Sequence, residues 1–261
     1  MMRSCLSFPL MSTALELALF SCVLLGLRHG FDYDHLAAIT DITSVQRGWK
    51  QGMGLGLLYA LGHALTVAIL GCAVIFLHLS LPAHMDAVGE RLVGATLIAL
   101  SLYVLVTFVR QRSLPGHKHI PRSRIALLIS GVKYAGWRVR RLAGSASPKP
   151  EPFSFKYDRS SVFAVGIIHG LGAETPSQLL LFLLAANLGG TGTGFLGLLA
   201  FIFGLLVMNT LMTASASGIF AKSTNNPRLQ TIVTSLAAVY SFVVGVIFLS
   251  GASDRLPTLM H

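Results

Sequence analysis

The chain has 261 residues, of which 53% are hydrophobic and only 11% are charged, and its mean hydropathy is +0.69. An average soluble domain carries about 25% charged residues, so this composition excludes a soluble enzyme domain, a disordered chain and a small disulfide-stapled module. Lys and Arg number 20 against 10 Asp and Glu, a net charge of +10, and the three cysteines form no CxxC pair that would indicate a metal or redox site.

Six stretches are long and apolar enough to be transmembrane helices, which need about 20 predominantly apolar residues. The sequence therefore predicts an all-α integral membrane protein. We interpret the first stretch as a membrane helix rather than a signal peptide, because it lacks a basic start and a small-residue cleavage site. The six stretches cover 12–38, 52–79, 87–109, 161–188, 193–221 and 229–252.

A polar insert, 110–160, divides the chain into a three-helix half at 1–109 and a second three-helix half at 161–261. Its Pro- and Ser-rich end, 144–152, is typical of a linker. The segment 125–142 is apolar and then basic, which favours a helix lying on the membrane surface over a seventh span.

The basic surplus is concentrated in this insert, which holds twelve Lys and Arg residues. Four more lie in the two loops that share its side of the membrane, against three on the opposite side. By the positive-inside rule, the insert is cytoplasmic and both termini are outside. We expect a multi-pass protein of the cytoplasmic membrane whose insert binds anionic lipid, and we expect no nucleic-acid partner.

Ionisable side chains are costly inside a membrane span and are functional candidates for that reason. The densest group is RHGFDYDH at 28–35. On a continuous helix, His29, Asp32 and His35 fall within an arc of about 120°, whereas Asp34 points elsewhere unless the helix loosens. Imidazole and carboxylate ligands suit Ni(II), Co(II) or Zn(II). The alternative is a helix end whose charges are solvated.

Four further polar residues lie deep in later spans. His63 is in the second stretch, where a hydrogen-bonded packing histidine is the alternative to a ligand. His169 and Glu174 lie near the midplane of the fourth stretch, and the Gly and Pro residues around Glu174 suggest a broken helix beside a cavity. Asn209 in the fifth stretch is a weaker candidate, with interhelical hydrogen bonding as the favoured interpretation.

A faint internal repeat links the two halves. GLRHG at 26–30 followed by Asp34 matches GIIHG at 166–170 followed by Glu174, at a constant offset. Each match lies in the first span of a three-span half, so the halves would be inverted relative to each other. Inverted repeats are typical of secondary transporters.

The segment 28–35 resembles the RHAxDADHI signature of the nickel/cobalt transporter family. The segment LGHA around His63 is similar to a later LGHS-type segment of that family, and LGAETPS at 171–177 resembles its LGFDTATE-type segment more loosely. Alanines of the signature are replaced by Gly30 and Tyr33, and the predicted six spans are fewer than the family's usual eight.

The residues and the resemblance together predict a permease, not an enzyme, that carries nickel or cobalt as substrate and holds no permanent cofactor. A metalloenzyme maturation system is a further expected partner. Binding should weaken below about pH 6.5, because ligation requires neutral imidazole. The predicted metal-binding residues are His29, Asp32, Asp34, His35, His63, His169 and Glu174.

Two other functions remain open at this point. The same residues could form a proton relay in an exporter of small organic solutes or amino acids. They could also hold a catalytic metal in an intramembrane metalloenzyme.

Overall fold

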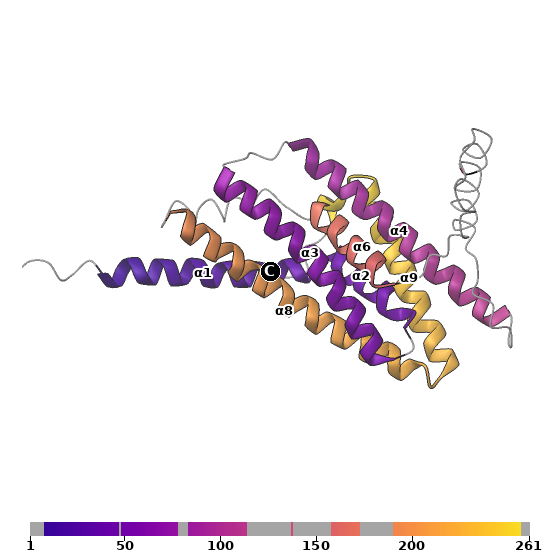
Figure 1. The fold of residues 1–261 in the computed structure, drawn as a ribbon. Helices are drawn as coiled ribbons and strands as arrows, with labels where there is room; N and C mark the ends of the chain where they lie inside the picture. Colours follow the sequence, from indigo (N-terminus) through magenta and orange to yellow (C-terminus); the bar gives the residue numbers. More distant parts are fainter. Residues whose placement is uncertain are drawn as a thin grey trace, which may run out of the picture.

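A computed structural model describes residues 8–46, 48–77, 83–113, 137, 158–172 and 190–256 (Figure 1). Every regular element in these residues is helical. The α-helices are α1 (Phe8–Gly30), α2 (Tyr33–Ser44), α3 (Trp49–Leu77), α4 (Ala83–Ser113), α6 (Arg159–Gly172), α8 (Thr191–Ser223) and α9 (Pro227–Leu249), followed by a short 3-10 helix, η1 (Ser253–Arg255).

Four segments of the described residues are helical, long and apolar enough to cross a membrane. They are α3, the Ala87–Val106 part of α4, α8 and α9, and they coincide with the second, third, fifth and sixth predicted spans. The fourth predicted span begins as α6, and its remainder lies outside the described residues. In the part of the chain that the structure describes, it confirms an all-helical fold with membrane-type helices, while the count of six spans and the outside position of both termini stay predictions.

The first predicted span is wrong as a single helix. The chain forms α1 up to Gly30, turns at Phe31 and Asp32, and starts α2 at Tyr33. Backbone hydrogen bonds from Phe31 to Arg28 and from Asp32 to His29 close this turn at 3.0 and 3.1 Å. The predicted arc of ligands on one continuous helix face is therefore replaced by two helix ends that meet.

The short helix α2 lies inside the bundle. It packs against α3, α4, α8 and α9, and most of its residues are buried, including Asp34, His35 and Asp41. Around it, α1 packs along α8, α3 packs on both α6 and α8, and α4 packs on α9 (Figure 1). A polar helix is thus enclosed by apolar ones.

Several helices cross so closely that only glycine fits. A Cβ on Gly26 would overlap the Phe201 carbonyl of α8, and a Cβ on Gly166 would overlap the Tyr59 carbonyl of α3. These two glycines are equivalent in the predicted repeat. Such contacts let the helix backbones approach each other, as is common in membrane helix pairs.

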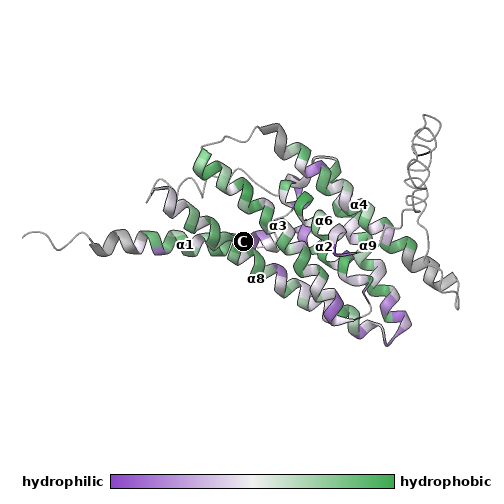
Figure 2. Cartoon of the chain, viewed as in Figure 1, coloured by the Kyte–Doolittle hydropathy of each residue, from purple (hydrophilic) through white to green (hydrophobic). Residues whose placement is uncertain are grey.

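The distribution of polarity is reversed from that of a soluble protein. Large apolar side chains on the outside of the bundle are exposed, such as Ile69, Phe203 and Leu236 at 59%, 62% and 65%. Hydrophobic residues occupy much of the length of α3 and α8 (Figure 2). The buried interior contains His35 and His63, both at 0%. This arrangement suits a lipid environment outside and a polar site within.

The insert at 110–160 begins in the last residues of α4. The segment 125–142, which is predicted as a surface helix, lies outside the described residues except for Trp137. The division into two halves and the inverted repeat also stay predictions.

Candidate metal site

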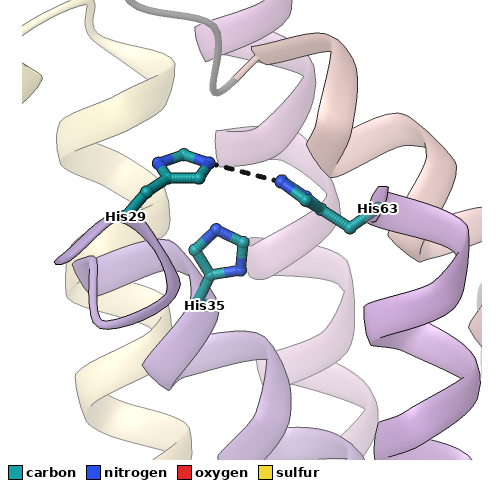
Figure 3. A group of neighbouring side chains, drawn as sticks. All are labelled: His29, His35 and His63. Carbon is teal, nitrogen blue, oxygen red and sulfur yellow. Dashed lines mark hydrogen bonds between the residues drawn. The ribbon is translucent and has the colours of Figure 1, made fainter. Parts of the chain in front are cut away.

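Three buried histidines converge at the centre of the bundle (Figure 3). His29, His35 and His63 each offer one ring nitrogen, and these nitrogens all lie within 4.8 Å of one another. The centroids of the His35 ring and the His63 ring are 4.4 Å apart, and those of His29 and His35 are 4.9 Å apart. Among the described residues this is the group of His, Cys, Asp and Glu side chains suited to holding a metal ion.

The break between α1 and α2 brings the first two histidines together. His29 is in the last turn of α1, and His35 is in the first turn of α2. His63 comes from the middle of α3, which packs beside α2. The three ligand candidates therefore belong to three helices, and no single helix fixes the distances between them.

The spacing of two of these nitrogens matches that of ligands on one ion. Nε2 of His29 and Nε2 of His63 are 3.3 Å apart. Two imidazole nitrogens at about 2.0–2.1 Å from a tetrahedral ion are separated by about 3.3–3.4 Å. The same distance also permits a weak hydrogen bond, in which one of the two rings carries its proton on Nε2.

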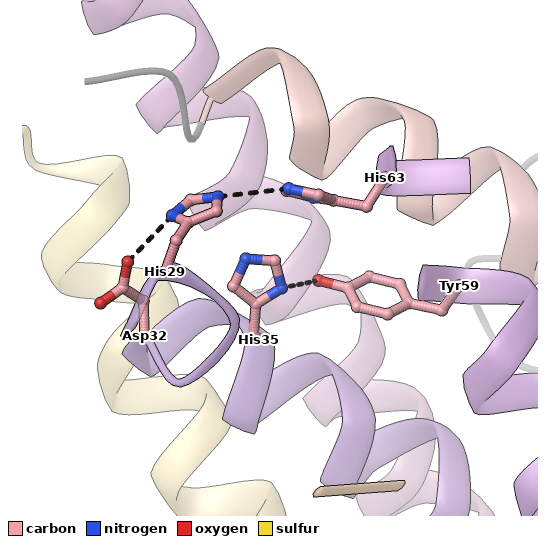
Figure 4. A network of polar contacts seen from close by, with 5 residues as sticks. All are labelled: His29, Asp32, His35, Tyr59 and His63. Carbon is pink, nitrogen blue, oxygen red and sulfur yellow. Dashed lines mark hydrogen bonds and ion pairs between the residues drawn. The ribbon is translucent and has the colours of Figure 1, made fainter. Parts of the chain in front are cut away.

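Asp32 orients His29 (Figure 4). Oδ2 of Asp32 accepts a hydrogen bond from Nδ1 of His29 at 3.1 Å. Although Asp32 occupies the N-cap position of α2, its carboxylate makes no capping hydrogen bond. Since Nδ1 of His29 carries the proton, its Nε2 presents a lone pair toward His63. Carboxylate–histidine pairs of this kind hold metal-ligating imidazoles in orientation.

His35 has a different partner. Its Nδ1 lies 3.2 Å from the Tyr59 hydroxyl, whose oxygen is also 3.0 Å from Nδ1 of His169. Nε2 of His169 in turn lies 2.7 Å from the hydroxyl of Thr96 on α4. Nε2 of His35 has no hydrogen-bond partner within the described part of the chain, and it faces the other two histidines (Figure 4). His169 is thus linked to the three-histidine group through Tyr59 and is not a member of it.

The other predicted ligands take different positions. Asp34 is buried, at 3% exposure, in the first turn of α2, but it is not part of the three-histidine group. The side chain of Asp32 is 47% exposed and reaches the group only through His29. Glu174 lies outside the described residues. Asn209 is fully buried on α8, and its amide atoms have no hydrogen-bond partner among the described residues.

Sequence reasoning missed two residues of this network. Tyr59 is four residues before His63 on α3 and hence on the same helix face, a signal that could have found it. Thr96 follows no motif, and nothing in the sequence distinguishes it from other threonines in apolar helices.

Several known nickel and cobalt transporters are similar to this chain in sequence. It is 25% identical to a nickel transporter of Staphylococcus aureus over 85% of this chain and 69% of the relative. It is 30% identical to a cobalt transport protein of Rhodococcus rhodochrous over 65% of this chain and 49% of the relative. A high-affinity nickel transport protein of Cupriavidus necator is 24% identical over 85% of this chain. These relatives are nickel and cobalt transporters.

The similarity is distant and partial. The chain spans 69%, 49% and 66% of the lengths of these three relatives. No family model matches the chain, and no solved structure matches it. The relatives support the resemblance to the nickel/cobalt transporters, whereas they do not test the individual site residues.

Proposed function

We propose that the chain carries a divalent transition-metal ion, Ni(II) or Co(II), across the cytoplasmic membrane through His29, His35 and His63. The observation that carries this proposal is the convergence of three buried ring nitrogens within 4.8 Å of one another, in a bundle of membrane-type helices. The names of the relatives support the same metals.

The donor set suits these ions. Three imidazoles form a borderline site that fits Ni(II), Co(II) or Zn(II) better than hard cations such as Mg²⁺. Cys22 and Cys72 are free thiols outside the group, so the described residues supply the site with none of the soft ligands that favour Cu(I). Three protein ligands leave coordination positions for water or for further side chains, as a passing ion requires.

Asp34 and Glu174 stay in the proposal as further ligands on the route of the ion, and Asp32 acts by orienting His29. The basic insert at 110–160 would face anionic lipid, and a metalloenzyme maturation system would receive the ion. The exporter and metalloenzyme alternatives gain no support from the relatives, since these are named as metal transporters.

The test is accumulation of radioactive nickel and cobalt by cells that express the full chain. His29→Ala and His35→Ala should each abolish uptake or efflux above the background of cells without the gene. Cys72→Ala is the matched control, because it also truncates a side chain on the bundle's helices but lies outside the histidine group. Membrane levels of each variant are compared by immunoblot. Unchanged flux in both histidine variants would contradict the proposed site.

A further inference from the structure

His169 lies between two hydroxyl groups, that of Thr96 and that of Tyr59, and Tyr59 connects it to His35. Each hydroxyl has only one proton to donate. This limit determines the direction of every hydrogen bond between Thr96 and His35.

The hydrogen bonds of Thr96 fix the position of the proton on His169. Its hydroxyl donates to the Val93 carbonyl at 2.8 Å, within α4. The Thr96 oxygen must then accept at its second contact, which is Nε2 of His169 at 2.7 Å. His169 therefore carries its proton on Nε2, and in a neutral imidazole Nδ1 is left as an acceptor.

The hydrogen bonds of Tyr59 in turn fix the position of the proton on His35. Its hydroxyl is 3.0 Å from Nδ1 of His169, which can only accept, so Tyr59 donates there. The Tyr59 oxygen then accepts from Nδ1 of His35 at 3.2 Å. A neutral His35 with its proton on Nδ1 has its lone pair on Nε2, the nitrogen without a partner among the described residues. That nitrogen faces His29 and His63 (Figure 4).

We infer that Thr96, His169 and Tyr59 form a directional hydrogen-bond chain that holds the lone pair of His35 on Nε2, where it can bind the ion. This inference rests on the proposed function and gives His169 a different role from the ligand role that the sequence predicts. His169 is a positioning residue, not a ligand. Its two ring nitrogens are both engaged, one by Tyr59 and one by Thr96, so neither is available to a metal.

A positioning role for His169 also explains why its imidazole is buried between α6 and α3. His169 is 0% exposed on α6, and Tyr59 is 0% exposed on α3. Their ring centroids are 5.5 Å apart at an interplanar angle of 86°, and the Tyr59 hydroxyl reaches Nδ1 of His169. The close glycine contact between Gly166 and the Tyr59 carbonyl brings α6 near enough to α3 for this contact.

The experiment compares two replacements of His169 in the full-length protein purified in detergent. His169→Gln keeps an acceptor for Tyr59 and a donor for Thr96, while His169→Leu removes both. Cobalt affinity is measured by equilibrium dialysis, and the visible d–d spectrum of bound Co(II) reports its coordination. We expect the Leu variant to bind about 10–100-fold more weakly, as is typical for loss of an outer-shell partner, and the Gln variant to keep most of the affinity and the same spectrum.

Two variants of Thr96 test the same hydrogen-bond chain in case His169→Leu does not fold. Thr96→Val removes the hydroxyl that accepts from Nε2 of His169 at the start of the hydrogen-bond chain, whereas Thr96→Ser retains it. The Val variant should lose affinity and the Ser variant should rescue it. The folded state of every variant is checked by its elution from a sizing column and its thermal midpoint.

The possible results separate the two proposals. Equal loss in His169→Gln and His169→Leu would show that the imidazole itself is required, as for a ligand, and would overturn the positioning role. Full affinity in both His169→Leu and Thr96→Val would overturn it as well. His29→Ala is measured alongside: if it retains the parent affinity, the three-histidine site fails and the positioning inference fails with it. If only His29→Ala loses affinity, the site stands and the positioning inference alone is wrong.

Discussion

His29 and His63 face each other inside the bundle with their Nε2 atoms 3.3 Å apart, although 34 positions separate them in the chain. The contact joins the end of α1 to the middle of α3. Asp32 already holds the Nδ1 proton of His29, so the lone pair of that ring points at His63. The separation of these two atoms matches that of two imidazole ligands on one tetrahedral ion.

The first prediction concerns His63. His63→Ala should weaken cobalt binding by more than the roughly 10–100-fold expected for an outer-shell residue, because it removes a ligand itself. Binding is measured by equilibrium dialysis of the purified protein. Cys72→Ala, farther along α3, is the control, since it truncates a side chain but removes no ring nitrogen. Equal affinities in these two variants would contradict a ligand role for His63.

The second prediction concerns Asp32. Asp32→Ala should lower nickel and cobalt affinity about 10–100-fold, because His29 loses the carboxylate that fixes its orientation. Asp32→Asn should lose less, since its amide oxygen still accepts the hydrogen bond from Nδ1. If Asp32 is instead a direct ligand, the Asn and Ala variants should be similarly impaired. Isothermal titration with each metal measures this difference.

The third prediction tests the close crossing of α6 and α3. A Cβ on Gly166 would overlap the Tyr59 carbonyl and lie 3.0 Å from the backbone nitrogen of His63, so the two helices must separate. Gly166→Ala should destabilise the protein by about 1–3 kcal/mol, as overpacking does, and should weaken cobalt binding by displacing Tyr59. Both the thermal midpoint in detergent and the cobalt affinity are measured.

Gly54→Ala is the matched control on α3. Nothing lies within 4 Å of the position that its Cβ would take. Alanine is favoured over glycine in a helix by roughly 0.5–1 kcal/mol, so this variant should be as stable as the parent or slightly more stable. A similar loss of stability in both variants would show that the close crossing is not the cause.

The fourth prediction concerns the start of α6. Asp158 caps this helix by accepting from the backbone N–H of Ser161 at 2.8 Å and from the Ser161 hydroxyl. These hydrogen bonds from Ser161 hold the pKa of the Asp158 carboxyl below its usual value. Asp158→Ala should weaken the first turn of α6 by about 1 kcal/mol, which is measured as faster amide hydrogen exchange there.

The pH dependence of this cap follows from the lowered pKa. A carboxyl with a lowered folded-state pKa contributes stability that is fully present above its unfolded pKa, about 3.9, and that disappears as the pH falls through the folded value. The exchange difference between the parent and Asp158→Ala should therefore be constant near neutral pH and vanish in acid. A difference that persists when the carboxyl is protonated would exclude the charged cap as its cause.

The sequence predicted much of the helical framework, because lipid-facing helices must be apolar along their whole length. The predicted range 193–221 agrees with α8 (Thr191–Ser223), and 229–252 agrees with α9 within a few residues. Hydropathy could not locate the turn at Phe31 and Asp32, since the residues on both sides of it continue a helical pattern. Beyond the turn, α2 packs among four other helices, a tertiary arrangement that hydropathy does not describe.

The sequence pointed to the three histidines of the candidate group among seven predicted ligands, but it could not predict their arrangement. The RHGFDYDH segment and His63 indicated metal ligands, whereas their proximity depends on how α3 packs beside α2. The repeat gave His29 and His169 equivalent positions, and the structure places them in different surroundings. The His29 ring stacks on the ring of Phe201. The His169 ring instead contacts the hydroxyl of Tyr59.

The turn between α1 and α2 would couple ion binding to the angle between these two helices. His29 and His35 stand on opposite sides of this turn, so an ion bound by both would close a chelate ring that includes Phe31 and Asp32. With the ring closed, coordination bonds would hold the angle between the two helices. With the ring open, only the backbone turn and the surrounding packing would do so. Loading and unloading of the ion would then stiffen and relax this turn, and α1 would transmit the change to α8, along which it packs.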